Sequence, residues 1–526
     1  MKPSQIFGVV GALLISFVPL RADQKKGTWV AIVPPALEDA VMPLAGHRQM
    51  EGWEVRIQER DALGTGDELG VKIRDYLQTM AADEDVVKPV VAVLAGIPMA
   101  AADADQAGVV PSIEGDFLRM NGVAADSGYS LKDGKRVADL SVGRLPARNA
   151  DELEAMIAKM LKFESEAGAP RWKTRLSLIA GSSGGGPLAD GFVGQQLNVR
   201  LKSLPSRWTI GQVADLTGSL FNIPRKDLNG ATKELLEGGQ LFSCYIGHAA
   251  PWAVSSGSEN FFTREDFAAL EINTGAGVFL TCGCESLAVD VPGEDGHGFA
   301  AMRSANGPAA FIGAEHLSYA AIGLLAFDGL ANVLKDEKRD RLTLADCWQS
   351  VYGGIDTGEI NPTIFMLMDR SDGSGAQVTL VDQRKEHLQM WMLLGDPAMT
   401  IPLITEQVEL KIEVVDVVAN APLKVYGKLP HGWKKAAVHL TAERTIDSKP
   451  PANSKKKPNQ FILTETKVNV EAGSFETILA LPAALPGKRI MVRALAESEG
   501  ESAQGAISIA VKQPDLGVPP EVKVTP

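Results

Sequence analysis

Two apolar runs near the middle of the chain each end beside a reactive side chain. The first run ends at His248 and the second at Cys284. Between them, Thr263 with Asp266 three residues later is typical of a helix N-cap, so we expect a strand, a helical crossover and a second strand. Such crossovers usually place the two strands side by side. Because sites in open α/β sheets form outside the carboxyl ends of the strands, an imidazole and a thiol should face one crevice.

This pair predicts nucleophilic catalysis by a thiol. A thiol with a pKa of about 8.5 attacks slowly unless a base or its surroundings raise the thiolate fraction. The tetrahedral oxyanion formed by such an attack needs fixed donors, each contributing roughly 3 to 4 kcal/mol. Two other interpretations stay open. Cys282 could be the nucleophile, or Cys244, His248, Cys282 and Cys284 could bind zinc, since thiolates and imidazole suit a tetrahedral site.

The composition indicates a soluble globular protein of several domains. The chain has 526 residues, of which 45% are hydrophobic and 22% charged. A net charge of −13 argues against a nucleic-acid partner, which would need a basic stripe. Four cysteines are too few for a disulfide scaffold in a chain of this length. Cys244, Cys282 and Cys347 lie in apolar stretches and are expected to be buried thiols.

The N-terminus is typical of a signal peptide. Lys2 precedes the apolar run 6–20, and Ala22 leads into a polar stretch. The run is short for a membrane span, which needs about 20 apolar residues, although an uncleaved anchor remains an alternative. We therefore expect a leader over 1–22 and a secreted or periplasmic protein, with the cell surface as a further candidate location. After leader cleavage, no contact with the membrane is expected.

The rest of the chain divides by pattern into two α/β subdomains, a β-sandwich and a tail. Strands alternate with helices over 23–168 and again over 169–404, which predicts a mainly parallel sheet covered by helices on both faces. Over 405–512 short runs with a period of two predict an antiparallel sandwich of immunoglobulin type. The end, 513–526, is Pro-rich and expected to be disordered.

Several motifs in this order resemble the gingipain-type cysteine peptidases, which have a caspase-like fold. The shared pieces are two strand ends, a strand before a capped helix, a helix after the second strand end, and a closing Gly-Asp-Pro. They read Ile246-Gly-His248, Thr281-Cys-Gly-Cys284, Asp139-Leu-Ser-Val-Gly-Arg-Leu-Pro146, Gly298-Phe-Ala-Ala-Met-Arg303 and Leu394-Gly-Asp-Pro-Ala398. Together they cover about residues 85 to 403.

The resemblance implies an exported cysteine endopeptidase that hydrolyses peptide bonds through an acyl-thioester. Cys284 would be the nucleophile, and His248 the general base and then the acid. The backbone N–H groups of Cys284 and Ala249 would form the oxyanion hole. Protein or peptide substrates are the expected partners, and no cofactor is required.

The chain departs from the family pattern at several positions. Position 249 is Ala where the family has Gly. The acidic partner of the histidine falls near Gly184, and the carboxylate that accepts arginine falls near Gln195. Trp252, four residues after His248, could wall the substrate pocket or pack in the core. A catalytically inactive binding or scaffold protein is therefore the alternative from another class.

A glycine-rich loop, two further histidines and an acidic loop are expected to have structural roles. The glycine-rich loop 181–186 is not followed by Gly-Lys-Ser/Thr, so it predicts a strand-to-helix turn at the rim of the site and not a phosphate loop. His297 and His316 are expected to be structural. An acidic loop could hold a structural calcium ion or simply be solvated; its residues are Asp290, Glu294 and Asp295.

Overall fold

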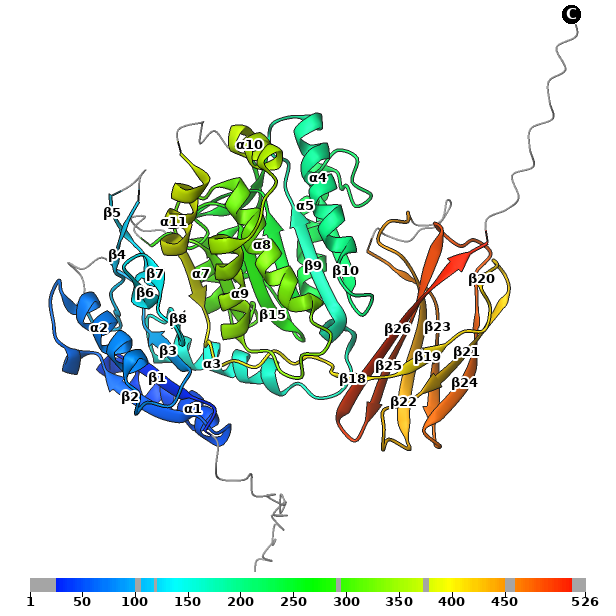
Figure 1. Ribbon diagram of the computed structural model, residues 1–526, viewed down its shortest axis with the longest axis horizontal. Coiled ribbons are helices and arrows are strands. Elements are labelled where there is room, and N and C mark those ends of the chain that lie inside the picture. The colour runs from blue at the N-terminus through cyan, green and yellow to red at the C-terminus, as the bar shows by residue number, and fades with distance from the viewer. Residues whose placement is uncertain are drawn as a thin grey trace, which may run out of the picture.

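The computed structural model describes residues 25–99, 106–117, 121–289, 295–371, 378–449 and 459–512. The expected leader, the Pro-rich tail, and Asp290 and Glu294 of the proposed calcium loop lie outside these residues. Figure 1 shows an α/β body, blue to yellow, followed along the long axis by a β-sandwich in orange and red. In the part of the chain that the structure describes, no helix has both the length and the apolar character needed to cross a bilayer.

One ten-stranded sheet forms the centre of the body. Its spatial order is β10-β9-β11-β15-β16-β17-β8-β3-β1-β2. The strands are β1 (Thr28–Val33), β2 (Glu54–Glu59), β3 (Val90–Ala95), β8 (Leu140–Leu145), β9 (Arg175–Ala180), β10 (Thr209–Ala214), β11 (Gln240–Ile246), β15 (Ala276–Cys282), β16 (Ala310–Ala314) and β17 (Trp391–Leu394). All neighbours pair in parallel except β16 and β17. The prediction of a mainly parallel sheet is confirmed.

Helices cover both faces of this sheet. They are α1 (Glu38–Met50), α2 (Leu69–Ala82), α3 (Ala150–Ser165), α4 (Pro187–Lys202), α5 (Leu228–Glu237), α6 (Arg264–Ala268), α7 (His297–Arg303), α8 (Ala320–Lys335), α9 (Leu344–Thr357), α10 (Pro362–Ser371) and α11 (Leu380–Met390). Alternate residues of β1 belong to different cores: Trp29 and Ala31 pack in the core that contains α1 and α3 residues, whereas Val30 and Ile32 pack with α2. A strand buried on both faces reads as a continuous apolar run, as β1 does.

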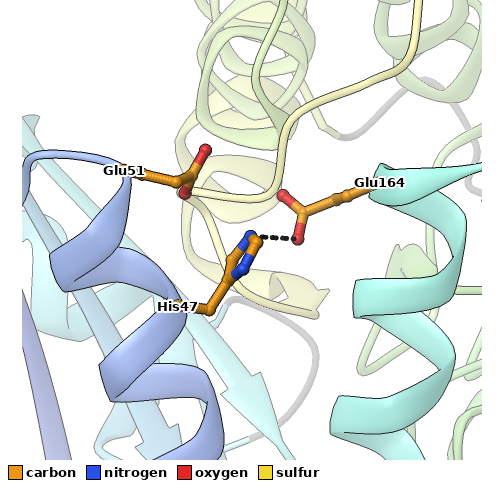
Figure 2. Close-up of side chains that lie close together, drawn as sticks. All are labelled: His47, Glu51 and Glu164. Atoms are coloured by element: carbon orange, nitrogen blue, oxygen red, sulfur yellow. Dashed lines mark ion pairs between the residues drawn. The ribbon is translucent and has the colours of Figure 1, made fainter. Parts of the chain in front are cut away.

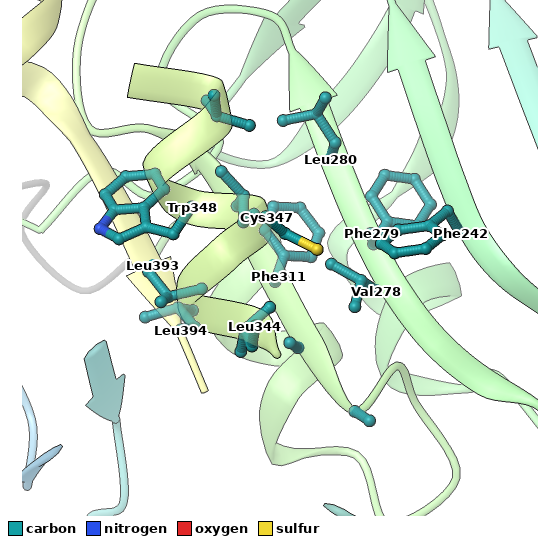
Figure 3. Close-up of a cluster of buried hydrophobic side chains, with 14 of the residues drawn as sticks. Phe242, Val278, Phe279, Leu280, Phe311, Leu344, Cys347, Trp348, Leu393 and Leu394 are labelled. Carbon is teal, nitrogen blue, oxygen red and sulfur yellow. The ribbon is translucent and has the colours of Figure 1, made fainter. Parts of the chain in front are cut away.

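Figure 3 shows buried side chains from the strands β11, β15, β16 and β17 and from α9. The rings of Phe279 in β15 and Phe311 in β16 stack with centroids 5.1 Å apart. Cys347 of α9 lies among these side chains, and burial raises the pKa of its thiol well above the ordinary value. Cys244 and Cys282 are buried as well, which confirms the expectation for all three thiols.

Two of the sequence motifs meet where β8 pairs with β17. Leu394 lies opposite Arg144 in the register. A Cβ at Gly143 would collide with the carbonyl oxygen of Gly395 and lie 3.0 Å from the ring of Pro397, so only glycine permits this approach. The buried Arg144 donates to Asp126 at 2.8 Å and to two backbone carbonyls. These close contacts explain why glycine and arginine occur together in this strand.

The C-terminal residues form two facing sheets around a separate apolar core. The larger sheet contains β18 (Glu406–Gln407), β20 (Asp416–Val417), β22 (Ala436–Arg444), β23 (Ile462–Val470), β25 (Arg489–Ser498) and β26 (Glu501–Val511). The smaller contains β19 (Glu409–Lys411), β21 (Pro422–Lys428) and β24 (Ser474–Ala480). Pairing is antiparallel except where β18 and β20 join β26. The Asn459 side chain hydrogen-bonds both backbone groups of Gln212, at 2.7 and 2.8 Å, and so covers part of the edge of β10.

The crossover from β11 to β15 differs from the expectation of a single helix. It contains a small antiparallel sheet of β12 (His248–Ala250), β13 (Ala253–Ser256) and β14 (Glu259–Thr263), and only then the short α6. The predicted cap of α6 is confirmed, since Thr263 and Asp266 form a capping box. The strands of three to five residues were missed because so short a run carries little periodicity. Two further hairpins were also missed: β4 (Glu114–Asp116) with β5 (Asn121–Ala124), and β6 (Leu131–Lys132) with β7 (Lys135–Arg136).

Candidate active site

The strands β11 and β15, which precede His248 and Cys284, are direct parallel neighbours. Ile246 lies opposite Cys282 in the register. His248 and Cys284 each follow two residues later, so both leave the sheet at its carboxyl edge, close to one another along the ladder. The predicted strand adjacency is confirmed.

The two segments that follow these strands pack directly on each other. A Cβ added at Gly283 would lie 2.8 Å from the Cβ of Ala249 and 3.0 Å from the carbonyl oxygen of Gly247. Gly247 itself has a φ of +156°, and a side chain there would collide with the hydroxyl of Tyr245. The small residues before His248 and Cys284 therefore allow the two strand ends to touch.

His248 is exposed and is held by a backbone group. Its Nε2 lies 3.0 Å from the carbonyl oxygen of Ser183. A carbonyl oxygen only accepts, so Nε2 donates in this contact and Nδ1 carries the lone pair of the neutral ring. Gly184, where the family's acidic partner was expected, is exposed with a φ of +73°. The acceptor that faces the ring is the backbone carbonyl of Ser183, one residue earlier.

The loop that supplies this carbonyl is the glycine-rich turn between β9 and α4. The helix begins at Pro187, so the predicted strand-to-helix turn at the rim of the site is confirmed. The buried carboxylate of Asp190 accepts from the hydroxyl of Ser182 at 2.8 Å, and from the N–H and hydroxyl of Ser183 at 2.8 and 2.9 Å. Sequence reasoning missed Asp190, although an acidic residue in the first turn of a helix is a recognisable signal.

Tyr245 contacts the backbone of His248 through its hydroxyl group. Its buried hydroxyl lies 2.6 Å from the carbonyl oxygens of His248 and Ser255. Burial raises the pKa of this phenol far above its ordinary value, so it stays a neutral hydrogen-bonding group. Sequence reasoning placed Tyr245 only in an apolar strand.

Cys284 is half-buried, and its sulfur contacts Ser318, which follows the buried His316 by two residues. The Sγ atom lies 3.7 Å from both the carbonyl oxygen and the hydroxyl of Ser318. The next residue, Glu285, has a φ of +51° and donates its N–H to the carbonyl of His316 at 3.0 Å. Partial burial raises the pKa of Glu285. No sequence pattern pointed to Ser318, since it follows β16 in an irregular segment.

The other predicted site residues take varied positions. Ala249 lies in extended backbone within β12, so its Cβ causes no strain there. Trp252 is 47% exposed, and the interpretation of it as a core residue is therefore wrong. Gln195 is exposed on α4. Their roles as oxyanion donor and pocket residues stay predictions.

His297 and His316 are buried and bind backbone carbonyls. His297 lies 3.1 Å from the carbonyl of Ala250 through Nδ1 and stacks on Phe267. Burial lowers the pKa of His297 to about 4. His316 lies 3.1 Å from the carbonyl of Ala124. Both contacts fit the structural roles that the sequence suggested.

The cysteine and histidine cluster does not converge on a zinc site. Among the described residues, the one group of three potential metal ligands within 4.8 Å is His47, Glu51 and Glu164. Figure 2 shows these side chains converging between α1 and α3. Arg48, however, already binds Glu51 at 2.6 Å and Glu164 at 2.9 Å. We therefore assign this group to an ion-pair network that joins the two helices.

Asp295 is the one residue of the predicted calcium loop that the structure describes. It forms an ion pair with Arg303 of α7. A calcium ion in this loop stays a prediction.

The mainly parallel sheet, with a thiol and an imidazole after adjacent strands, belongs to a caspase-like fold, and the family model places the chain in the class of cysteine peptidases. The chain belongs to peptidase family C25, whose model matches residues 22–402.

The fold is similar to that of solved gingipain structures. The Arg-specific cysteine proteinase gingipain R (RgpB) matches with a TM-score of 0.55 and 15% identity, over 94% of this chain and 100% of that one. The complex of Porphyromonas gingivalis RgpB pro- and mature domains matches with a TM-score of 0.53 and 14% identity, over 92% and 100%. No curated protein matches the chain. At such identities the structural matches establish the fold, and the family model establishes the cysteine peptidase.

Proposed function

We propose that this chain is an exported endopeptidase in which His248 and Cys284 form a catalytic dyad. The observation that carries the proposal is the parallel pairing of β11 with β15, which brings the two residues to one edge of the sheet. The direct packing of Gly283 on Ala249 supports it, because the two strand ends are held together.

The proposed reaction uses the free nitrogen of the imidazole. Nδ1 of His248 takes the proton of the Cys284 thiol, and the thiolate attacks the carbonyl carbon of the scissile peptide bond. The N–H groups of Ala249 and Cys284 stabilise the oxyanion. When the C–N bond breaks, the imidazolium returns its proton to the leaving amine. A water molecule, deprotonated by His248, then attacks the acyl-thioester, and the acid product and the free thiol are released.

The Ser183 carbonyl supports this assignment for His248. It accepts from Nε2 at 3.0 Å, fixes the tautomer with the lone pair on Nδ1, and favours the imidazolium that forms when the thiol loses its proton. A backbone carbonyl does this without the full charge of a carboxylate.

Substrates are proposed to be proteins or peptides. The exposed Trp252 forms one wall of the substrate pocket in this proposal. The positions of the family's two carboxylates hold Gly184 and Gln195, so neither supplies a negative charge for an arginine side chain. Export is proposed from the leader-like residues 1–22, and N-terminal sequencing of secreted protein would locate the cleavage site.

A fluorogenic peptide library, combined with alkylation and peptide mapping, tests the dyad. We expect Cys284 to be the first of the four thiols that iodoacetamide labels, and Cys284→Ala to lose all turnover. The matched control is Cys282→Ala, which removes a buried thiol two residues away and should retain turnover. Turnover that persists in Cys284→Ala would refute the mechanism. A wild-type protein with neither hydrolysis nor selective labelling would instead indicate the inactive scaffold.

A further inference from the structure

Asp190 is a buried carboxylate beside the site whose hydrogen bonds all go to one short segment. Its oxygens accept from Ser182 and Ser183 at 2.8 to 2.9 Å. Ser183 is also the residue whose carbonyl oxygen faces Nε2 of His248. Asp190 is thus linked to the imidazole through a single residue.

These bonds are not those of an ordinary helix cap. At the N-termini of α3, α6, α9 and α11 a side chain accepts from a backbone N–H of the same helix. The N-cap of α4 is Gly186, which offers no side chain. The carboxylate of Asp190, four residues into the helix, points its hydrogen bonds back to the loop, so its role concerns the loop.

The opposite side of the same segment is also fixed. The N–H of Ser182 donates to the hydroxyl of Ser256 at 2.8 Å, and the N–H of Gly257 donates to the carbonyl of Ser182 at 2.9 Å. The hydroxyl of Ser256 donates to Asp215 at 2.6 Å. The peptide before Ser183 is therefore held from two sides. The next peptide, which carries the Ser183 carbonyl, is held by the N–H of Gly184, which donates to the hydroxyl oxygen of Ser182 at 3.2 Å.

We propose that Asp190 is the positioning residue for His248 and acts through Ser183. The proposal rests on the proposed dyad. Asp190 fixes the backbone of Ser183, so that its carbonyl oxygen orients the imidazole and keeps the proton on Nε2. Its negative charge also favours the imidazolium. In this proposal a carboxylate still supports the histidine, but it acts through Ser183 and does not contact the ring.

Two substitutions separate geometry from charge. Asn at position 190 can accept from Ser183 through its oxygen and donate to the hydroxyl of Ser182, so Asp190→Asn keeps the loop and removes the charge. Asp190→Ala removes both. The matched control is Asp346→Asn, because Asp346 also accepts from a hydroxyl near a helix N-terminus, that of α9. The N-terminus of α9 lies beside Met399 and Pro397, whose carbonyls accept from Leu344 and Ala345, after the end of antiparallel β17. It is thus at the opposite edge of the sheet from Cys284.

The readouts are kcat/KM on the best library peptide and the rate of Cys284 alkylation as a function of pH. For Asp190→Ala we expect a fall in kcat/KM of about 10- to 100-fold, the size of effect that a misplaced catalytic group produces. For Asp190→Asn we expect the upper limb of the alkylation profile to move to lower pH, because a negative charge that favours the imidazolium has been removed. Asp346→Asn should match the wild type in both.

The outcomes separate this inference from the proposed function. If the wild type shows no hydrolysis and no selective alkylation of Cys284, the dyad fails. If the wild type is active and a folded Asp190→Ala keeps both the wild-type rate and the wild-type pH profile, Asp190 has no positioning role while the dyad stands. An unchanged profile in Asp190→Asn overturns the contribution of the charge. A thermal melt monitors folding, and should Asp190→Ala unfold, Asp190→Asn decides.

Discussion

Two histidines near the site differ in what their surroundings allow. His248 is exposed, whereas His297 is wholly buried and lies against the carbonyl of Ala250. Because that carbonyl accepts, Nδ1 of His297 donates, and the ring stays neutral because burial disfavours its charged form. Its pKa of about 4 reflects the cost of burying an imidazolium. In the proposed dyad His248 exchanges protons, whereas His297 holds backbone.

His297 should make the fold less stable in mild acid. The unfolded chain protonates this imidazole below a pKa of about 6.5, but the folded protein does so only near 4. Between these values the unfolded state binds more protons, so stability falls as the pH drops through this window, by about 2 kcal/mol at pH 5. His297→Gln, which keeps a donor for Ala250, should lose this part of the pH dependence. Urea unfolding at pH 7.5 and pH 5 measures it, and equal losses in both proteins would contradict the assignment.

At the scale of elements, the site depends on contact between the ends of β11 and β15. Paired strands alone set the register, but the segments beyond them must also pack. Gly283 has no Cβ, and Ala249 fills the space that such a Cβ would need. The alanine at 249, a departure from the family's glycine, is therefore compatible with the site because its neighbour at 283 is glycine.

This packing predicts a coupled pair of substitutions. Gly283→Ala places two Cβ atoms 2.8 Å apart and should shift Cys284 away from His248, with a fall in kcat/KM of about 10- to 100-fold. Ala249→Gly removes one of the clashing atoms, so the double variant should recover a large part of the activity. Ala249→Gly alone should change activity little and serves as the control. Additive losses in the double-mutant cycle would show that the two positions do not contact each other.

Sequence patterns predicted the strands and the edge that carry the site, because apolar runs of β11 and β15 are unambiguous and parallel neighbours end at one edge. They did not predict what faces the two reactive groups. The partner of His248 is the carbonyl of Ser183, and a backbone group has no residue signature. Ser318 reaches Cys284 across 34 positions of sequence, which is a tertiary contact without periodicity. The sequence therefore predicts the strands that position the site better than it predicts the tertiary contacts within the site.

At the scale of the whole molecule, one buried carboxylate links β1 and β17, which are the first and the last strands of the ten-stranded sheet in sequence order. Asp396 follows β17 and accepts from Trp29 of β1 at 3.1 Å and from Arg48 of α1 at 2.6 Å. It also accepts from the N–H of Ala398 at 2.9 Å. The Gly-Asp-Pro motif thus closes the body by binding the N-terminal elements.

Loss of this carboxylate should destabilise the body as a whole. Asp396→Ala leaves a fully buried guanidinium without one of its partners, and breaking a buried pair in this way costs about 3 kcal/mol or more. The unfolding midpoint followed by tryptophan fluorescence should fall clearly, because Trp29 also loses its acceptor. The control is Glu476→Ala, which breaks an exposed pair with Lys424 on the sandwich and should leave the midpoint of the body unchanged, as surface pairs contribute little. Equal midpoints for both variants would mean that Arg48 is held adequately by Glu51 and Glu164, and that the motif is kept for its turn geometry alone.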